Sequence, residues 1–294
     1  MTRTERTYYL VQALYHCSWS FTAPIYSLFL LSRGLDLLQI NLVFATYLLA
    51  AFLFEVPTGA IADRFGRKLS FLLSCVVRAS AFFYYYFADS FGEFLVAEFI
   101  DAIGTTLATG ALDAWAVDGI RGEGDHRPKD RMFARAHMIA RMPMMLSGLV
   151  AGYIAEGGLE IPFLAGTTFF LITALAGWTL MQDDRAAVAA ERARSDRARG
   201  GVLPVMRAGW QDLRADATLR LLWWLTFVIS FAALPTWHYW PPRMEELSGG
   251  SVWLMGWVFA GLNLSAIIGT ILSSRLQTWR REWLLAMATL ARAA

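Results

Sequence analysis

Charged residues are scarce in this chain of 294 residues, and cysteine is almost absent. Asp, Glu, Lys and Arg make up 17% of the sequence, apolar and aromatic residues make up 56%, and the mean hydropathy is +0.42. This composition excludes a soluble globular domain. The two cysteines, Cys17 and Cys75, both fall inside apolar stretches, so the sequence contains no disulfide framework.

The residue patterns of common enzymes are also missing. The sequence has no His and Cys cluster at metal-ligand spacing and no phosphate-binding loop. We therefore expect no enzyme activity, no catalytic residues, no metal and no cofactor. The net charge of +2 comes from basic residues that orient the chain in the membrane, so nucleic acid is not an expected partner.

Long apolar stretches fill most of the chain. A helix needs about 20 mostly apolar residues to cross a bilayer. Eight stretches reach that length, and a ninth begins at 283 and stops at 294; the eight are 8–31, 37–61, 69–88, 94–117, 133–155, 161–181, 221–240 and 252–273. The sequence predicts an all-α protein of the lipid bilayer.

The breaks between these stretches divide the chain into three parts. Residues 1–181 are predicted to form a complete six-helix bundle, 182–220 a polar linker, and 221–294 a partial second bundle with two helices and the start of a third. Within the linker, Met206, Trp210, Leu213 and Ala217 recur at helical spacing. That piece is either an amphipathic helix in the membrane interface or a solvated connection, and both readings stay open.

The basic residues orient the chain. Lys and Arg favour the cytoplasmic side of short loops. With the N-terminus inside, 21 of the 26 basic residues lie on the inner side, and only Arg33 and Arg243 lie on the outer side. We expect a cytoplasmic (inner) membrane protein with a cytoplasmic N-terminus and linker.

One short basic segment separates the second and third stretches. It reads Gly59-Ala-Ile-Ala-Asp63-Arg64-Phe-Gly66-Arg67-Lys68. Gly66 allows a tight turn, Gly59 allows close helix packing, and the Asp63 carboxylate is able to accept hydrogen bonds from an arginine or from helix amides. A second interpretation is that the three positive charges only keep the segment on the cytoplasmic side of the membrane.

This segment resembles the signature loop of the major facilitator superfamily. The run TGALDAWAVD at 109–118 and the plan of six helices, a long charged loop and further helices are also similar to that family. The preceding FEVPTGAIADRFGRK resembles a bacterial branch related to drug efflux carriers. The resemblance implies two six-helix bundles that rock about a central site. It also implies that Asp63 is a latch carboxylate with Arg64, Arg67 and Lys68 around it, and Asp118 is a plausible partner for one of these arginines.

Several ionisable residues fall inside the apolar stretches, where a charge costs about 2.5–3.5 kcal/mol and needs a partner or a cavity. On the fourth stretch, a polar stripe at helical spacing points toward the expected cavity. A second polar face runs along the first stretch. The candidate proton- or substrate-binding residues are Gln12, His16, Glu55, Glu98, Asp101, Asp113 and Arg141.

Each candidate has a structural alternative. Glu98 is near enough to the outer end to reach lipid headgroups, and Asp101 is deeper with no obvious basic neighbour. Asp113 and Glu55 are expected to pair with Arg141, Arg78 or the basic segment. His16 is read first as a hydrogen-bonded lining residue, and residues 84–86 as an interfacial belt of tyrosines.

Other positions depart from the family pattern. The stretch before Gly104 has acids where many members have an arginine, and Gly148 and Gly152 only partly match a glycine-rich motif of family antiporters. The two glycines predict close helix packing, with or without a role in sealing against leaks. These departures weaken the expectation of proton antiport.

The sequence predicts a secondary transporter of a small organic, amphipathic substrate that works by alternating access, and proton-coupled efflux is one mode that it leaves open. The alternatives are a metabolite uptake carrier and a non-transporting remnant or membrane-embedded regulatory protein. The final stretch spans only about 18 Å against a hydrocarbon core of about 30 Å. We therefore expect an incomplete carrier, truncated in its ninth helix.

Overall fold

A computed structural model describes residues 1–124, 130–182, 211 and 214–275. Every regular element in these residues is a helix, which confirms the all-α class. The expected start of a ninth helix and residues 183–210 and 212–213 of the linker lie outside the described residues. The side chains of 226–227 and 229–238, which include part of the expected cavity wall, lie outside them too.

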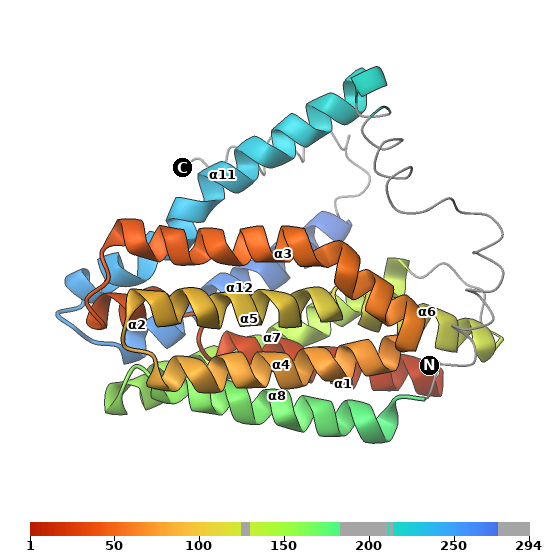
Figure 1. Cartoon of the computed structure of the whole chain (residues 1–294), viewed down its shortest axis with the longest axis horizontal. Coiled ribbons are helices and arrows are strands. Elements are labelled where there is room, and N and C mark those ends of the chain that lie inside the picture. Colours follow the sequence, from red (N-terminus) through yellow and green to blue (C-terminus); the bar gives the residue numbers. More distant parts are fainter. Residues whose placement is uncertain (125–129, 183–210, 212–213, 276–294) are drawn as a thin grey trace.

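The first eight helices form a bundle whose long members run side by side (Figure 1). α4 packs against both α5 and α8, α3 lies on α5, and α1 lies between α7 and α8. The elements of this bundle are α1 (Arg3–Ser20), α2 (Tyr26–Ser32), α3 (Leu37–Phe65), α4 (Arg67–Phe87), α5 (Phe91–Ala108), α6 (Ala111–Gly122), α7 (Asp130–Ile154), the short 3-10 helix η1 (Ala155–Gly157) and α8 (Ile161–Leu180). We call the end that holds Gly66 the motif end, and the opposite end the α2 end.

Two of the expected spans are broken in the structure. The span 8–31 is divided into α1 and α2, because Pro24 has no N–H and its ring would clash with the carbonyl of Ser20 if the helix continued. The span 94–117 is divided into α5 and α6 at Thr109 and Gly110, where the glycine has a φ of 71°. The polar stripe predicted along one continuous helix therefore ends near Thr105.

The basic segment is also more helical than its glycines suggested. α3 continues through Gly59 to Phe65, and only Gly66, with a φ of 100°, separates it from α4. That left-handed conformation favours glycine because it has no Cβ. A single residue therefore makes the turn, and Gly59 is an exposed residue within a helix.

Two further helices follow the linker. α11 (Ala217–Leu247) begins four residues before the expected span, and α12 is Trp253–Arg275. Figure 1 shows α11 near α2 at one end and well separated from α3 at the other. At the near end, the Asn41 side-chain amide donates to the Tyr239 hydroxyl over 3.1 Å.

α12 packs closely on α7 through glycines. A Cβ added to Gly152 would lie 2.7 Å from the Trp253 carbonyl oxygen, and one added to Gly256 would lie 2.6 Å from the Gly148 carbonyl oxygen. The N-terminus of α12 is held as well, because the Trp253 N–H donates to the Glu156 carboxylate over 2.8 Å. The predicted packing role of Gly148 and Gly152 is thereby confirmed.

This contact yields a prediction with a matched control. Gly256→Ala should destabilise the protein by about 1–3 kcal/mol, because the added methyl must push the two backbones apart. Gly261→Ala on the same helix has nothing within 4 Å of its Cβ and should leave stability unchanged or slightly raised. Thermal unfolding of both variants in detergent measures the difference, and equal midpoints would contradict the packing argument.

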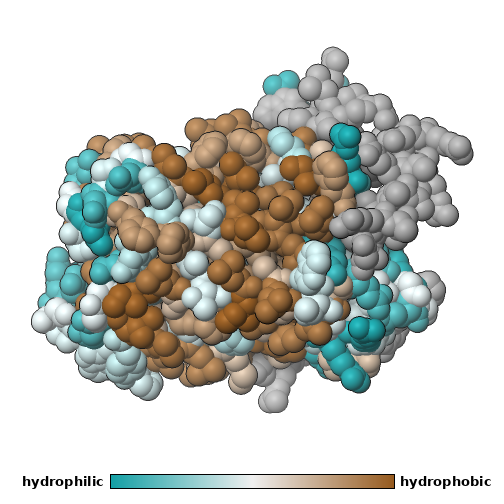
Figure 2. All heavy atoms as spheres, turned by 60° about the horizontal axis from the view of Figure 1, so that its bottom comes forward, coloured by the Kyte–Doolittle hydropathy of each residue, from teal (hydrophilic) through white to brown (hydrophobic). Residues whose placement is uncertain are grey.

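The outer surface of the bundle is apolar. Within the described residues, six helical segments are long and apolar enough to cross a membrane: Leu37–Phe65, Arg67–Phe87, Phe91–Gly122, Met132–Gly157, Ile161–Leu180 and Trp253–Thr270. Figure 2 shows a broad hydrophobic zone with hydrophilic residues toward both ends of this face. Leu171, Leu175 and Trp178 of α8 are examples of large apolar side chains that are exposed. Such a surface suits contact with lipid chains.

Candidate functional site

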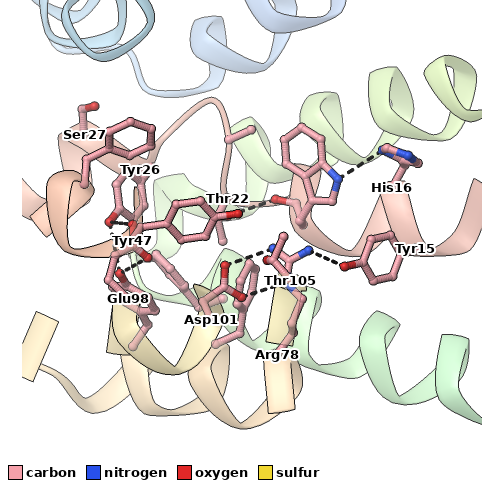
Figure 3. Close-up of a pocket in the computed structure, with 16 residues that line it drawn as sticks. Tyr15, His16, Thr22, Tyr26, Ser27, Tyr47, Arg78, Glu98, Asp101 and Thr105 are labelled. Carbon is pink, nitrogen blue, oxygen red and sulfur yellow. Dashed lines mark hydrogen bonds and ion pairs between the residues drawn. The ribbon is translucent and has the colours of Figure 1, made fainter. Parts of the chain in front are cut away.

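A cavity of about 400 Å³ lies within the bundle (Figure 3). It is bounded by α1, α2, α3, α4, α5 and α8, and half of its lining residues carry a phenyl, phenol or indole ring. Its lining residues are Tyr15, His16, Trp19, Thr22, Ala23, Tyr26, Ser27, Phe44, Tyr47, Arg78, Phe82, Tyr85, Glu98, Asp101, Thr105 and Phe163.

A buried ion pair forms one wall of this cavity. Arg78 Nε donates to Asp101 Oδ1 over 2.8 Å and Nη2 donates to Oδ2 over 3.1 Å, and each side chain is only 8% exposed. Arg78 Nη1 also donates to the Tyr15 hydroxyl over 3.0 Å. The expectation that Asp101 has no basic neighbour was wrong, because the register of α4 against α5 places Arg78 beside it.

Aromatic rings surround the same guanidinium. Its central carbon lies 4.7 Å from the ring centre of Phe170, 5.4 Å from that of Tyr15 and 5.8 Å from that of Phe82. Ring faces attract a cation, and the attraction is strongest where water is excluded. The two helices approach closely here because residue 104 is glycine, and a Cβ at that position would lie 2.5 Å from Arg78 Cγ.

The second acidic group, Glu98, is held by two tyrosines. The Tyr26 hydroxyl donates to Oε1 and the Tyr85 hydroxyl to Oε2, each over 2.8 Å. Glu98 is 7% exposed and Tyr85 is 1% exposed. The expectations that Glu98 reaches the headgroups and that Tyr85 belongs to an interfacial belt were therefore wrong, because both side chains point inward.

The polar face of α1 continues the cavity wall. Trp19 Nε1 donates to His16 Nδ1 over 3.2 Å, and His16 Nε2 lies 3.1 Å from the side-chain nitrogen assigned to Gln12. An indole N–H can only donate, so Nδ1 accepts; a neutral ring then has its hydrogen on Nε2 and donates to Gln12 with the amide turned so that its oxygen accepts. His16 lines the cavity as expected, and Gln12 is buried next to it.

Three other candidates lie apart from the cavity. Asp113 of α6 accepts from the Tyr8 hydroxyl over 2.7 Å, Glu55 is exposed on α3, and Arg141 is half-buried on α7. Among the described residues, neither Glu55 nor Arg141 has an ion pair. The expected pairing of Asp113 or Glu55 with Arg78 was wrong, because Asp101 occupies that position.

The basic segment makes its contacts within the bundle. Arg67 forms an ion pair with Asp118, as the sequence predicted, and also donates to the Ala114 carbonyl over 3.0 Å. Lys68 Nζ donates to the last carbonyls of α8, those of Trp178 and Met181. These contacts tie α4 to α6 and α8.

Asp63 and Arg64, the two charged residues between Gly59 and Gly66, do not make such contacts with the described residues of α6 or α8. Asp63 and Arg64 are exposed at the end of α3, and Arg64 lies over the ring of Phe65 at 5.4 Å. In the part of the chain that the structure describes, Asp63 has no hydrogen bond or ion pair. The latch role of Asp63 remains a prediction.

Sequence reasoning missed the aromatic residues that complete the site. Tyr26, Tyr47 and Phe163 come from three different helices, and no spacing rule brings them together. The Arg78–Asp101 pair did have a signal, since the two opposite charges lie near the middle of consecutive stretches. No group of three or more His, Cys, Asp or Glu side chains suited to a metal ion occurs in the described residues.

Comparison with known proteins identifies the family. A family model described as the Major Facilitator Superfamily matches residues 8–294, and the chain belongs to that family. An uncharacterised MFS-type transporter of Bacillus subtilis (strain 168), YxaM, is 24% identical over 270 residues, which cover 92% of this chain and 66% of that protein. The chain thus spans just under two thirds of the length of this relative.

Two solved structures have a similar fold. The nucleoside transporter NupG has a TM-score of 0.72 at 12% identity, covering 99% of this chain and 68% of its own. A D-xylose-proton symporter has a TM-score of 0.62 at 14% identity, covering 94% of this chain and 69% of its own. The family match, together with the apolar helices, makes the chain an integral membrane protein.

Proposed function

We propose that this chain moves a small, amphipathic organic substrate across a cytoplasmic membrane by alternating access. The observation that carries the proposal is the cavity of about 400 Å³, which combines aromatic walls with a buried ion pair and a second buried carboxylate. Substrate sites are concave, mostly apolar and contain a few fixed polar groups. A membrane protein has little reason to keep so many ionisable groups at this depth without a function.

The position of α11 supports alternating access. At the α2 end, Trp240 and Met244 pack against the hydrophobic core around Ile25 and Leu28, whereas the other end of α11 is separated from α3 (Figure 1). A carrier closed at one end and open at the other is one state of such a cycle. We propose that the motif end faces the cytoplasm, because Arg3, Arg64, Arg67 and Lys68 of the described residues lie toward it (Figure 1).

We propose Glu98 as the proton-binding group. Asp101 has a fixed positive partner in Arg78, whereas among the described residues Glu98 has only hydroxyl donors. A buried carboxylate without a cation is the group whose charge is most costly to keep, so it gains most from a proton. The titratable and charged groups facing it are Tyr26 from α2, Tyr47 from α3, Arg78 and Tyr85 from α4, and Asp101 from α5.

Export coupled to proton entry is the proposed direction, supported by the similarity of the basic segment to drug efflux carriers. Uptake is the second candidate, and the names of the two solved relatives favour it, since one is a nucleoside transporter and the other a proton symporter. The third candidate function is ligand binding without transport.

One experiment separates these three functions. The full-length protein is reconstituted in liposomes and tested against amphipathic amines, nucleosides and pentoses with a pH gradient of either sign. Export by antiport predicts that substrate accumulates in liposomes with an acidic interior, because protons leave as substrate enters. Symport predicts accumulation with an alkaline interior. Binding without flux under either gradient would overturn the proposal of transport.

A further inference from the structure

The hydrogen bonds around Glu98 leave the site rich in acceptors. Each tyrosine hydroxyl has one hydrogen, and Tyr26 and Tyr85 both donate theirs to the carboxylate. The two phenol oxygens lie 3.1 Å apart. With both hydrogens engaged, each oxygen keeps its lone pairs, and so does the carboxylate. A ligand that fits here must bring its own N–H or O–H donors.

The charges of the cavity sum to a negative value. Arg78 and Asp101 neutralise each other through two hydrogen bonds. His16 adds no positive charge, because its Nδ1 accepts a hydrogen bond from Trp19. Once Glu98 has released its proton, it is the uncompensated charge among the described lining residues, so a bound cation takes the place of that proton. An anionic ligand would meet that carboxylate in a medium of low polarity, where repulsion is strong.

The walls of the cavity suit a cation with an apolar body. The rings of Tyr26 and Tyr85, beside Glu98, have centroids 6.0 Å apart. The rings of Phe44 and Tyr47 on α3 are stacked with centroids 6.1 Å apart. Aromatic faces bind ammonium groups, and a buried carboxylate adds a charge-assisted hydrogen bond. The guanidinium of Arg78 is an example within the protein, because the rings of Tyr15 and Phe170 lie next to it.

We propose that the cavity selects a small organic cation: a protonated amine whose ammonium group binds Glu98 between Tyr26 and Tyr85 and whose apolar body lies against the aromatic wall. This inference rests on the proposed function, since it names the substrate class of the same cavity. A neutral polyhydroxylated ligand fits less well, because it needs as many donors as acceptors from the wall.

Three probes of similar size test the inference. Phenethylammonium, 2-phenylethanol and 3-phenylpropionate are titrated by calorimetry into the purified full-length protein at neutral pH. The cation should bind roughly tenfold or more tightly than the neutral alcohol, and the anion should bind most weakly. Equal affinity for the cation and the alcohol, or a preference for the anion, would overturn the proposal on the wild-type protein alone.

Variants then locate the binding group. Glu98→Gln should lower the affinity for phenethylammonium about tenfold while leaving that for 2-phenylethanol unchanged. Glu246→Gln removes a carboxylate that is 66% exposed and pairs with Arg243, and it should alter neither. An unchanged cation affinity in Glu98→Gln would refute the assignment.

The transport assay separates this inference from the proposed function. Transport of nucleosides or pentoses without any preference for the cation would refute the substrate class and leave transport intact. Cation-selective binding that depends on Glu98, without flux under either pH gradient, would support the binding site and refute transport.

Discussion

Replacing Asp101 with asparagine is expected to lower the free energy of unfolding by about 3–5 kcal/mol, because the change leaves Arg78 as an unpaired charge in the interior. The two side chains are each 8% exposed, so water cannot replace the lost carboxylate. Thermal unfolding in detergent should show the midpoint falling by roughly 10 °C. The aromatic rings around Arg78 offset part of the loss but offer no hydrogen-bond acceptor of carboxylate strength.

The double variant Arg78→Met/Asp101→Asn is the control for this effect. Removing both charges is far less costly than removing one, so the double variant should unfold close to the wild-type midpoint. If Asp101→Asn alone unfolds at the wild-type midpoint, the pair is not the buried structural unit described above. If the double variant loses as much stability as the Arg78→Met and Asp101→Asn single variants lose together, the two residues do not interact.

Glu98→Gln is expected to abolish accumulation of substrate against its gradient while exchange at high substrate concentration continues. Glutamine has nearly the same shape and its side-chain oxygen still accepts from one tyrosine, but the group no longer binds and releases a proton. Counterflow and pH-driven accumulation in the same liposomes measure the two activities. The pH dependence of transport should flatten along with the loss of accumulation.

Glu246→Gln is the matched control, because it removes an exposed carboxylate outside the cavity. A Glu98→Gln protein that accumulates substrate with the wild-type pH profile would assign proton binding to another group, with Asp101 next in order. Loss of exchange as well as accumulation would mean that Glu98 is required for substrate passage itself.

The sequence predicted the contacts that depend on local spacing. The resemblance of the basic segment predicts Asp118 as a partner for one of its arginines, which is Arg67, and the spacing of the α7 glycines predicts close helix packing. Each of these two predictions depends on a short sequence motif and not on how distant helices pack. The breaks at Pro24 and Gly110 were missed, because a long apolar run outweighed a single breaking residue in the reading.

The partners of the buried charges could not be predicted in the same way. Which acid meets Arg78 depends on the depth and rotation of α4 against α5, and hydropathy specifies neither. The same limit applies to Tyr26, which meets Glu98 only because the chain turns near Pro24, between α1 and α2. A shift of one residue turns a helical side chain by about 100° and would have separated these partners.

By itself the sequence determined the class of this protein: a helical membrane protein whose basic segment resembles that of the major facilitator superfamily. Apolar length is sufficient for the helical membrane class, because the bilayer demands helices that satisfy their own backbone, whereas the family follows from the resemblance of the basic segment. Only the tertiary structure decided that Asp101 is neutralised by Arg78 while Glu98 has hydroxyl partners. The reason is geometric, since the identity of a neighbour across a helix interface depends on three-dimensional packing.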